Sequence, residues 1–120
     1  MRRLLTATVA MILCDVALAH SSRWTADKVV GLHCDLVDPV RIENYAFSKN
    51  GLVALTIGTK EQITPPLWFW RIRDGRLQFS DGDSILEEFT LLGMRGGILI
   101  VRRQSGQVAR FHYQFEHRKT

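Results

Sequence analysis

Apolar and polar residues alternate along most of the chain beyond residue 30. Over residues 108–116, one side carries the apolar positions Ala109, Phe111, Tyr113 and Phe115. Side chains of a strand point alternately to its two faces, so this period of two predicts strands with one buried face. Similar runs, rich in valine, isoleucine and aromatic residues, predict about eight strands in all. They cover residues 30–37, 42–48, 52–58, 67–73, 76–80, 85–92, 97–103 and 108–116.

Dipeptides typical of tight turns separate these runs. They are Asn50-Gly51, Asp74-Gly75, Asp81-Gly82, Gly96-Gly97 and Ser105-Gly106. Such pairs supply the positive φ angles of short hairpins, so they favour antiparallel neighbours. A helix is expected only within residues 24–32, where Thr25 is placed to cap a turn or two and Asp27 favours the amino end. The predicted fold is all-β: an antiparallel meander that forms a small barrel or an open sandwich after a short helical turn.

The segment 67–73 carries the densest group of aromatic and basic residues. Alternation places Trp68, Trp70 and Ile72 on one face and Leu67, Phe69, Arg71 and Arg73 on the other. A surface for single-stranded nucleic acid needs aromatic and basic side chains on the same face, so no nucleic-acid partner is expected. Burying one tryptophan removes roughly 150–250 Å² from water. We therefore predict that both tryptophans lie in the core or in the wall of an internal cavity.

The first nineteen residues have the pattern of an export signal. A positive start at residues 1–3 precedes an apolar run at 4–14, and Ala17 and Ala19 form the small-x-small pattern of a cleavage site. The apolar run is shorter than the ~20 residues of a membrane-spanning helix. We expect cleavage after Ala19, no stable membrane span afterwards, and a periplasmic or secreted protein.

Removal of this segment leaves residues 20–120 as one domain. The loss of Arg2, Arg3 and Asp15 lowers the formal net charge from +4 to +3, which is weak support for polyanion binding. Cys14 is lost as well, so Cys34 is the remaining cysteine. A lone thiol in an oxidising compartment is buried, reactive, or paired between chains. Burial is favoured over an intermolecular disulfide, because free cysteine behaves as a small hydrophobic residue.

The order of elements resembles that of the small bacterial lipocalin-like proteins. The residues that carry this resemblance are Gly31, Tyr45, Phe47, Gly51, Trp70, Gly75, Leu77, Leu99, Val101, Gly106 and Phe115. The chain departs from the family at the head of the first strand, where Gly31-Leu32-His33 stands in place of Gly-x-Trp. The resemblance implies a barrel that binds a small apolar molecule inside, or a partner at its rim, without catalysis.

We therefore expect an exported, non-catalytic binding protein for a small apolar ligand or a protein partner. The expected ligand-lining residues are Trp68, Trp70, Phe111, Tyr113 and Phe115. A second hypothesis is a periplasmic inhibitor or immunity-type protein whose hairpin loops occlude the active site of another protein. The small size of the protein and its lack of catalytic motifs are consistent with both hypotheses.

A third hypothesis is a copper-binding protein. Cleavage after Ala19 makes His20 the first residue, and its α-amine and imidazole can chelate Cu(II) together with a second imidazole. The other histidines are His33, His112 and His117. Apart from this copper, no cofactor is expected.

Candidate catalytic groups do not form a recognisable set. His33 and Cys34 are adjacent on a predicted strand and point to opposite faces, so the imidazole is not placed to activate the thiol. Glu87 and Glu88 are also adjacent on a predicted strand, so their carboxylates point to opposite faces and do not form a catalytic pair. No Gly-rich phosphate loop, Gly-x-Ser-x-Gly elbow or His-Glu-x-x-His occurs in the sequence. The sequence therefore favours a binding protein over an enzyme.

Overall fold

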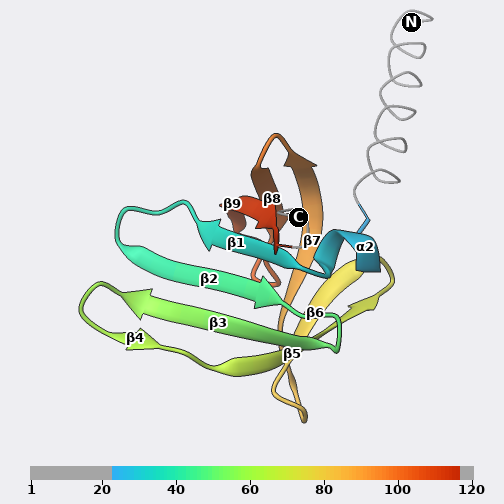
Figure 1. The fold of residues 1–120 in the computed structure, drawn as a ribbon, viewed down its shortest axis with the longest axis horizontal. Coiled ribbons are helices and arrows are strands. Elements are labelled where there is room, and N and C mark those ends of the chain that lie inside the picture. Colours follow the sequence, from blue (N-terminus) through green and yellow to red (C-terminus); the bar gives the residue numbers. More distant parts are fainter. Residues whose placement is uncertain (1–22, 117–120) are drawn as a thin grey trace, which may run out of the picture.

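The computed structural model describes residues 23–116, which form one short helix and nine strands (Figure 1). The helix is α2 (Ala26–Val29). The strands are β1 (Leu32–Leu36), β2 (Arg41–Phe47), β3 (Leu52–Thr59), β4 (Ile63–Thr64), β5 (Leu67–Arg73), β6 (Arg76–Ser80), β7 (Ile85–Arg95), β8 (Ile98–Arg102) and β9 (Val108–Phe115).

These strands form a closed antiparallel barrel. Their order is β2-β1-β9-β8-β7-β6-β5-β3-β4, and a further pairing between β2 and β3 closes the ring of eight strands. In Figure 1, β1 to β4 run across the view and β7 and β8 run steeply, so the sheet coils strongly around its interior. The all-β prediction is confirmed, and the fold is the barrel rather than the open sandwich. The architecture is compatible with a lipocalin-like barrel.

All eight predicted strands are present, with one addition and one extension. The addition is β4, a two-residue strand that pairs with the end of β3. It is too short to show alternation, which is why the sequence pattern did not reveal it. The extension is β7, which continues to Arg95 beyond the predicted end at residue 92. The pairing with β8 shifts register between Leu91 and Gly93, so a bulge lets this strand run on.

The β5–β6 turn shows why its sequence needs Asp-Gly. Asp74 and Gly75 both have positive φ angles, 54° and 75°, as a two-residue hairpin turn of the mirror-image type requires. A Cβ on Gly75 would lie 2.9 Å from side-chain atoms of Arg23. The backbone conformation therefore selects glycine here, whereas the exposed end of the Arg23 side chain is flexible and can move away from a Cβ.

The predicted helix occurs as the single turn α2, but its predicted cap does not form. The Thr25 hydroxyl makes no hydrogen bond to the helix backbone and instead donates to Oδ1 of Asp27 at 2.6 Å. Helix α2 is held in place by Trp24, which lies two residues before it. The backbone N–H of Trp24 donates to the carbonyl of Gly75 at 2.9 Å, and the Trp24 side chain is buried. Trp24 thus packs the segment before α2 against the end of the barrel that carries the β5–β6 turn.

The interior of the barrel is filled by aromatic and aliphatic side chains. Phe79 and Phe89 form an edge-to-face pair with centroids 4.9 Å apart, and Tyr45 packs against Phe79 at 5.3 Å. The buried apolar residues are Trp24, Val29, Leu32, Cys34, Tyr45, Phe47, Val53, Leu55, Leu77, Phe79, Phe89, Leu91, Leu99, Val101, Ala109 and Phe111. Aromatic edge and stacking contacts add to the free energy gained by burying these rings.

No helix within residues 23–116 has the length and apolar character needed to cross a membrane.

Substitution of Trp24 tests the role of this residue at the barrel end. We expect Trp24→Ala to lower the free energy of unfolding by about 3–5 kcal/mol, because it removes a buried indole and leaves a cavity. The indole N–H has no hydrogen-bond partner among the described residues. Trp24→Phe, which removes this unsatisfied donor and keeps a ring, should therefore cost clearly less. Urea unfolding followed by circular dichroism measures both, and equal losses would contradict this role.

Candidate functional site

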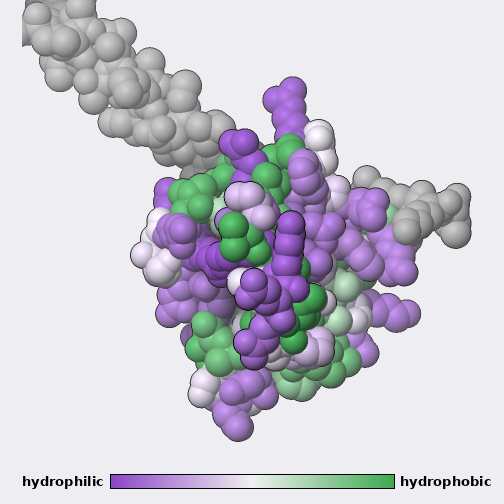
Figure 2. Space-filling model, turned by 90° about the vertical axis from the view of Figure 1, so that its left-hand side faces the viewer, coloured by the Kyte–Doolittle hydropathy of each residue, from purple (hydrophilic) through white to green (hydrophobic). Residues whose placement is uncertain are grey.

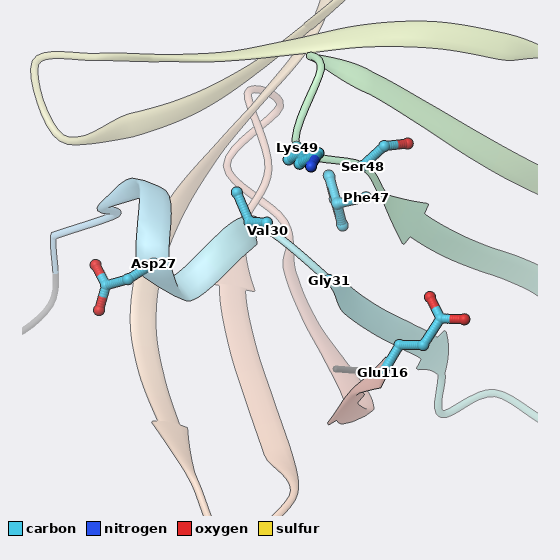
Figure 3. A pocket seen from close by; sticks show the side chains of 7 residues that line it. All are labelled: Asp27, Val30, Gly31, Phe47, Ser48, Lys49 and Glu116. Carbon is cyan, nitrogen blue, oxygen red and sulfur yellow. The ribbon is translucent and has the colours of Figure 1, made fainter. Parts of the chain in front are cut away.

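One hollow lies outside the barrel, beside α2. It measures about 560 Å³ and is named here the α2 groove (Figure 3). Its lining residues are Asp27, Val30, Gly31, Phe47, Ser48, Lys49 and Glu116. They come from α2 and the two residues after it, from the end of β2 with the β2–β3 turn, and from the residue after β9. The lining is mainly apolar: Val30 and Phe47 form its floor, and the charged residues Asp27, Lys49 and Glu116 stand at its edges.

Backbone hydrogen bonds fix the shape of this groove. The N–H of Gly31 donates to the carbonyl of Phe47 at 3.0 Å, and the N–H of Glu116 donates to the carbonyl of Gly31 at 2.9 Å. Gly31 thus ties the end of β2 to the end of β9. The N–H of Val30 donates to the carbonyl of Ala26 and closes α2 at 3.0 Å. The groove is therefore held in place before any ligand arrives.

The charged groups at the edges of the groove differ in their partners. Asp27 accepts the Thr25 hydroxyl, and Figure 3 shows its carboxylate pointing away from Val30 and Phe47. Oε2 of Glu116 lies 3.1 Å from Nε2 of His33. Lys49 makes no hydrogen bond or ion pair within residues 23–116. The Lys49 ammonium group is thus available to interact with a ligand in the groove.

A second hollow lies at the opposite end of the barrel, where the β1–β2 and β8–β9 loops meet. It measures about 330 Å³ and is named here the rim pocket. Its lining residues are Leu36, Val37, Asp38, Arg41, Arg103, Gln107, Val108, Ala109 and Arg110. Figure 2 faces the end that carries the β1–β2 and β3–β4 loops and shows apolar and charged groups interspersed there.

A buried ion pair stands behind the rim pocket. The Arg103 guanidinium donates two hydrogen bonds to the Glu43 carboxylate, both at 2.9 Å, and the Tyr45 hydroxyl donates to Oε2 of Glu43 at 2.6 Å. Arg41 lies further away, with Nη2 3.5 Å from Oε1 of Glu43. Glu43 is 4% exposed and the Arg103 side chain 11%. The guanidinium also lies over the ring of Phe89, 5.7 Å from its centroid.

This network is satisfied internally. Burial raises the pKa of the Tyr45 hydroxyl well above its ordinary value, and the Glu43 carboxylate adds to the effect. Burial acts to lower the pKa of Arg103, but its hydrogen bonds and charge interaction with Glu43 outweigh this and raise it. The Arg103 guanidinium and the Tyr45 hydroxyl both donate to the Glu43 carboxylate, so each of the three groups already has a partner inside the barrel. The arrangement braces the barrel.

Sequence reasoning did not identify Glu43. The signal was present in the alternation of residues 41–47, where Arg41 and Glu43 share a face with Tyr45 and Phe47. A charge on the apolar face of a strand indicates a partner inside the fold. That partner, Arg103, is 60 residues away along the chain, so the pair was visible only in the structure.

The five predicted ligand-lining residues occupy two regions of the barrel. Trp68 and Trp70 lie half-buried on the inner face of β5, as their alternation predicted. On β9, Phe111 is fully buried, and Tyr113 and Phe115 pack edge to face at 6.0 Å. Trp68 contacts Phe79 at 6.3 Å, and Phe111 contacts Phe89 at 6.0 Å. The two groups are thus joined by core rings, and their ligand role stays a prediction.

Cys34 and the histidines are placed on different faces. Cys34 is buried as predicted, whereas His33 points outward and reaches Glu116. Burial raises the pKa of the Cys34 thiol far above its ordinary value, and the nearby carboxylates of Asp35 and Glu43 reinforce this. Within residues 23–116 no group of three or more His, Cys, Asp or Glu side chains is arranged to hold a metal ion. His20 and His117, two of the proposed copper donors, lie outside the described residues.

The burial of Cys34 predicts an unreactive thiol. In the full chain carrying Cys14→Ser, we expect modification by a disulfide reagent such as dithionitrobenzoate to be at least about tenfold slower in the native protein than in urea, because the thiolate is the reacting species. Absorbance at 412 nm follows the released thionitrobenzoate. Comparable rates in both conditions would contradict this expectation.

The buried ion pair predicts non-additive substitutions. Arg103→Met leaves the Glu43 carboxylate buried without its main partner, so the free energy of unfolding should fall by about 3–5 kcal/mol. The double variant Glu43→Leu with Arg103→Met removes both charges and should recover most of that loss. Urea unfolding of wild type, both single variants and the double variant gives the coupling energy. A double variant as unstable as the sum of the singles would contradict a coupled pair.

Comparison of the chain with protein-family models, curated proteins and solved structures gives no match. Function is therefore inferred from the fold and from the two hollows.

Proposed function

We propose that this chain is an exported, non-catalytic binding protein that takes a small apolar molecule with one polar end in the α2 groove. The observation that carries the proposal is the groove itself. About 560 Å³ is within the roughly 300–1,000 Å³ typical of small-molecule sites. Its floor is Phe47 and Val30, and its one unpaired cation is Lys49. An apolar body on the floor and an acceptor group at Lys49 complement both features.

The filled barrel supports a site on the outside. Tyr45, Phe79, Phe89 and Phe111 pack ring against ring where an interior ligand would otherwise lie. Opening that space would separate these rings and cost several kcal/mol, because interiors are packed like organic crystals. The groove needs no such rearrangement.

Membership of the lipocalin-like group is part of this proposal. The closed eight-stranded barrel supports it, and the absence of Gly-x-Trp at Gly31-Leu32-His33 sets the chain apart from the usual pattern. Export rests on residues 1–19, which lie outside the described part of the chain. A periplasmic or secreted location is proposed on their sequence pattern alone.

The groove can be tested with anilinonaphthalene sulfonate, an apolar fluorophore with one anionic group. We expect saturable binding with enhanced fluorescence. Val30→Asp should weaken binding at least about tenfold, since it places a charge on the apolar floor. Lys49→Ala should weaken it about two- to fivefold, the range of an exposed charge pair.

Matched substitutions away from the groove control for general effects. Val37→Asp changes an exposed valine, and Lys60→Ala an exposed lysine, at the opposite end of the barrel. Both should leave the affinity unchanged. Equal losses for Val30→Asp and Val37→Asp, or no loss for either, would overturn the groove as the binding site.

A second candidate function is occlusion of another protein at the rim. The observation that favours it is a group of exposed apolar residues, Val37, Val40 and Val108, beside the cations Arg41 and Arg110. Apolar contacts ringed by arginine are typical of protein interfaces. This surface combines the β1–β2 loop with the first residues of β2 and β9, at the loop end of the barrel where an inhibitor of the proposed kind would make contact.

A photo-crosslinking amino acid distinguishes the two candidates. Placed at position 108 in the exporting cell, it should capture one discrete protein partner if the rim is the binding surface. Placed at position 30 as the matched control, it should capture none. Capture at position 30 alone, or at neither position, would contradict the rim candidate.

A further inference from the structure

Exposed apolar side chains lie on the outside of β3, β5 and β7, and β6 pairs between β5 and β7. Leu52 of β3 pairs with Phe69 of β5, Phe69 pairs with Ser80 of β6, and Ser80 pairs with Ile85 of β7. Leu67 precedes Phe69 by two residues and lies on the same outer face. Leu67, Phe69 and Ile85 are 61%, 44% and 41% exposed. Leu52, Leu67, Phe69 and Ile85 are named here the β5 face.

Charges of opposite sign border the two ends of this face. Toward the β5–β6 turn, Arg71 and Arg73 follow Phe69 on the same side of β5. Toward the other end, Ser80 leads directly into the β6–β7 turn with Asp81 and Asp83. Gly82 of that turn lies against Phe69, with the ring 3.7 Å from the position of a Cβ. The face therefore has an apolar centre, a basic end and an acidic end.

The outermost charges at both ends lack partners. Arg71 donates to Gln78 at 2.8 Å, and Arg76 shares Glu88 with Gln78. Arg73 stands directly opposite Arg76 across the β5–β6 pair, which places two like charges side by side. Within the described residues neither the Arg73 guanidinium nor the Asp83 carboxylate has a hydrogen bond or ion pair.

We propose that the β5 face binds the same face of a second copy of this chain. A two-fold axis through Phe69 exchanges the two ends, so the basic end of each copy meets the acidic end of the other. Arg73 lies four residues beyond Phe69, about 13 Å along the strand. Asp83 lies three residues beyond Ser80, the partner of Phe69, in the opposite direction. Opposite charges on the two sides of Phe69 suit the self-complementary contact of a two-fold dimer.

The alternating signs favour a second copy over a polyanion. A nucleic acid or an anionic membrane would be attracted by Arg71 and Arg73 and repelled by Asp81 and Asp83. A second copy satisfies both ends and covers the exposed apolar centre at the same time. The face shares no residue with the α2 groove, so this dimer is independent of the proposed ligand site. The small apolar centre indicates a transient dimer with less than about 1,200 Å² buried.

Sedimentation velocity on the purified full chain, over a range of concentrations, tests the dimer. We expect a reversible monomer–dimer equilibrium. Phe69→Glu should weaken it at least about tenfold by placing a carboxylate at the centre of the contact. Arg73→Glu and Asp83→Arg should each weaken it, because each sets like charges against one another across the two-fold axis.

The double variant Arg73→Glu with Asp83→Arg provides the decisive result. It exchanges the outermost charge of each end, so opposite charges meet again across the two-fold axis and the wild-type affinity should return. Variants that had lost affinity through unfolding would not regain it in combination. Arg102→Glu, at an exposed arginine on β8, is the matched control and should leave the equilibrium unchanged. Circular dichroism confirms that each variant is folded. A wild type that stays monomeric throughout, a dimer indifferent to Phe69→Glu, or no rescue by the double variant would overturn the proposal.

Discussion

The pairing of β2 with β3 is the contact on which the rest of the structure depends, because it closes the sheet on itself. Seven residue pairs from Arg41↔Thr59 to Phe47↔Val53 join the two strands. Closure forces every second side chain of eight strands into one narrow interior, which must then be filled. Tyr45, Phe79 and Phe89 meet there, although they lie on three different strands. The aromatic core is thus a consequence of closure as much as of composition.

The same closure explains the Glu43–Arg103 pair. A charge on the inner face of β2 loses its water when the ring closes, so it needs close partners of opposite charge or hydrogen-bond donors. Two hydrogen bonds from Arg103 and one from Tyr45 supply them. The pair lies near the end of the barrel where the loops meet, so it connects the β8–β9 loop to β2. The pair therefore stabilises the rim of the barrel. The other two arginines of the rim pocket, Arg41 and Arg110, are exposed to solvent.

A filled interior moves the candidate functions to the outside. The α2 groove exists because one helical turn and Trp24 pack against the barrel end without covering the β2–β3 turn completely. The β5 face exists because Leu67 and Phe69 alternate with tryptophans that the core requires. Inner and outer faces of one strand therefore serve different purposes. Trp68 and Trp70 stabilise the barrel, while their neighbours remain available to a partner.

The sequence by itself determined the strands, because alternation and turn dipeptides are local properties. Residues 67–73 and 108–116 could be assigned to strands, with their buried and exposed faces, from the period of two alone. The burial of Cys34 was predicted on another ground, because a free cysteine behaves as a small hydrophobic residue. Only the tertiary structure decided that the ring closes, that Glu43 meets Arg103, and that Val30 and Lys49 border one groove. These contacts join residues distant in sequence, and their geometry depends on strand register and coiling, which no local pattern encodes.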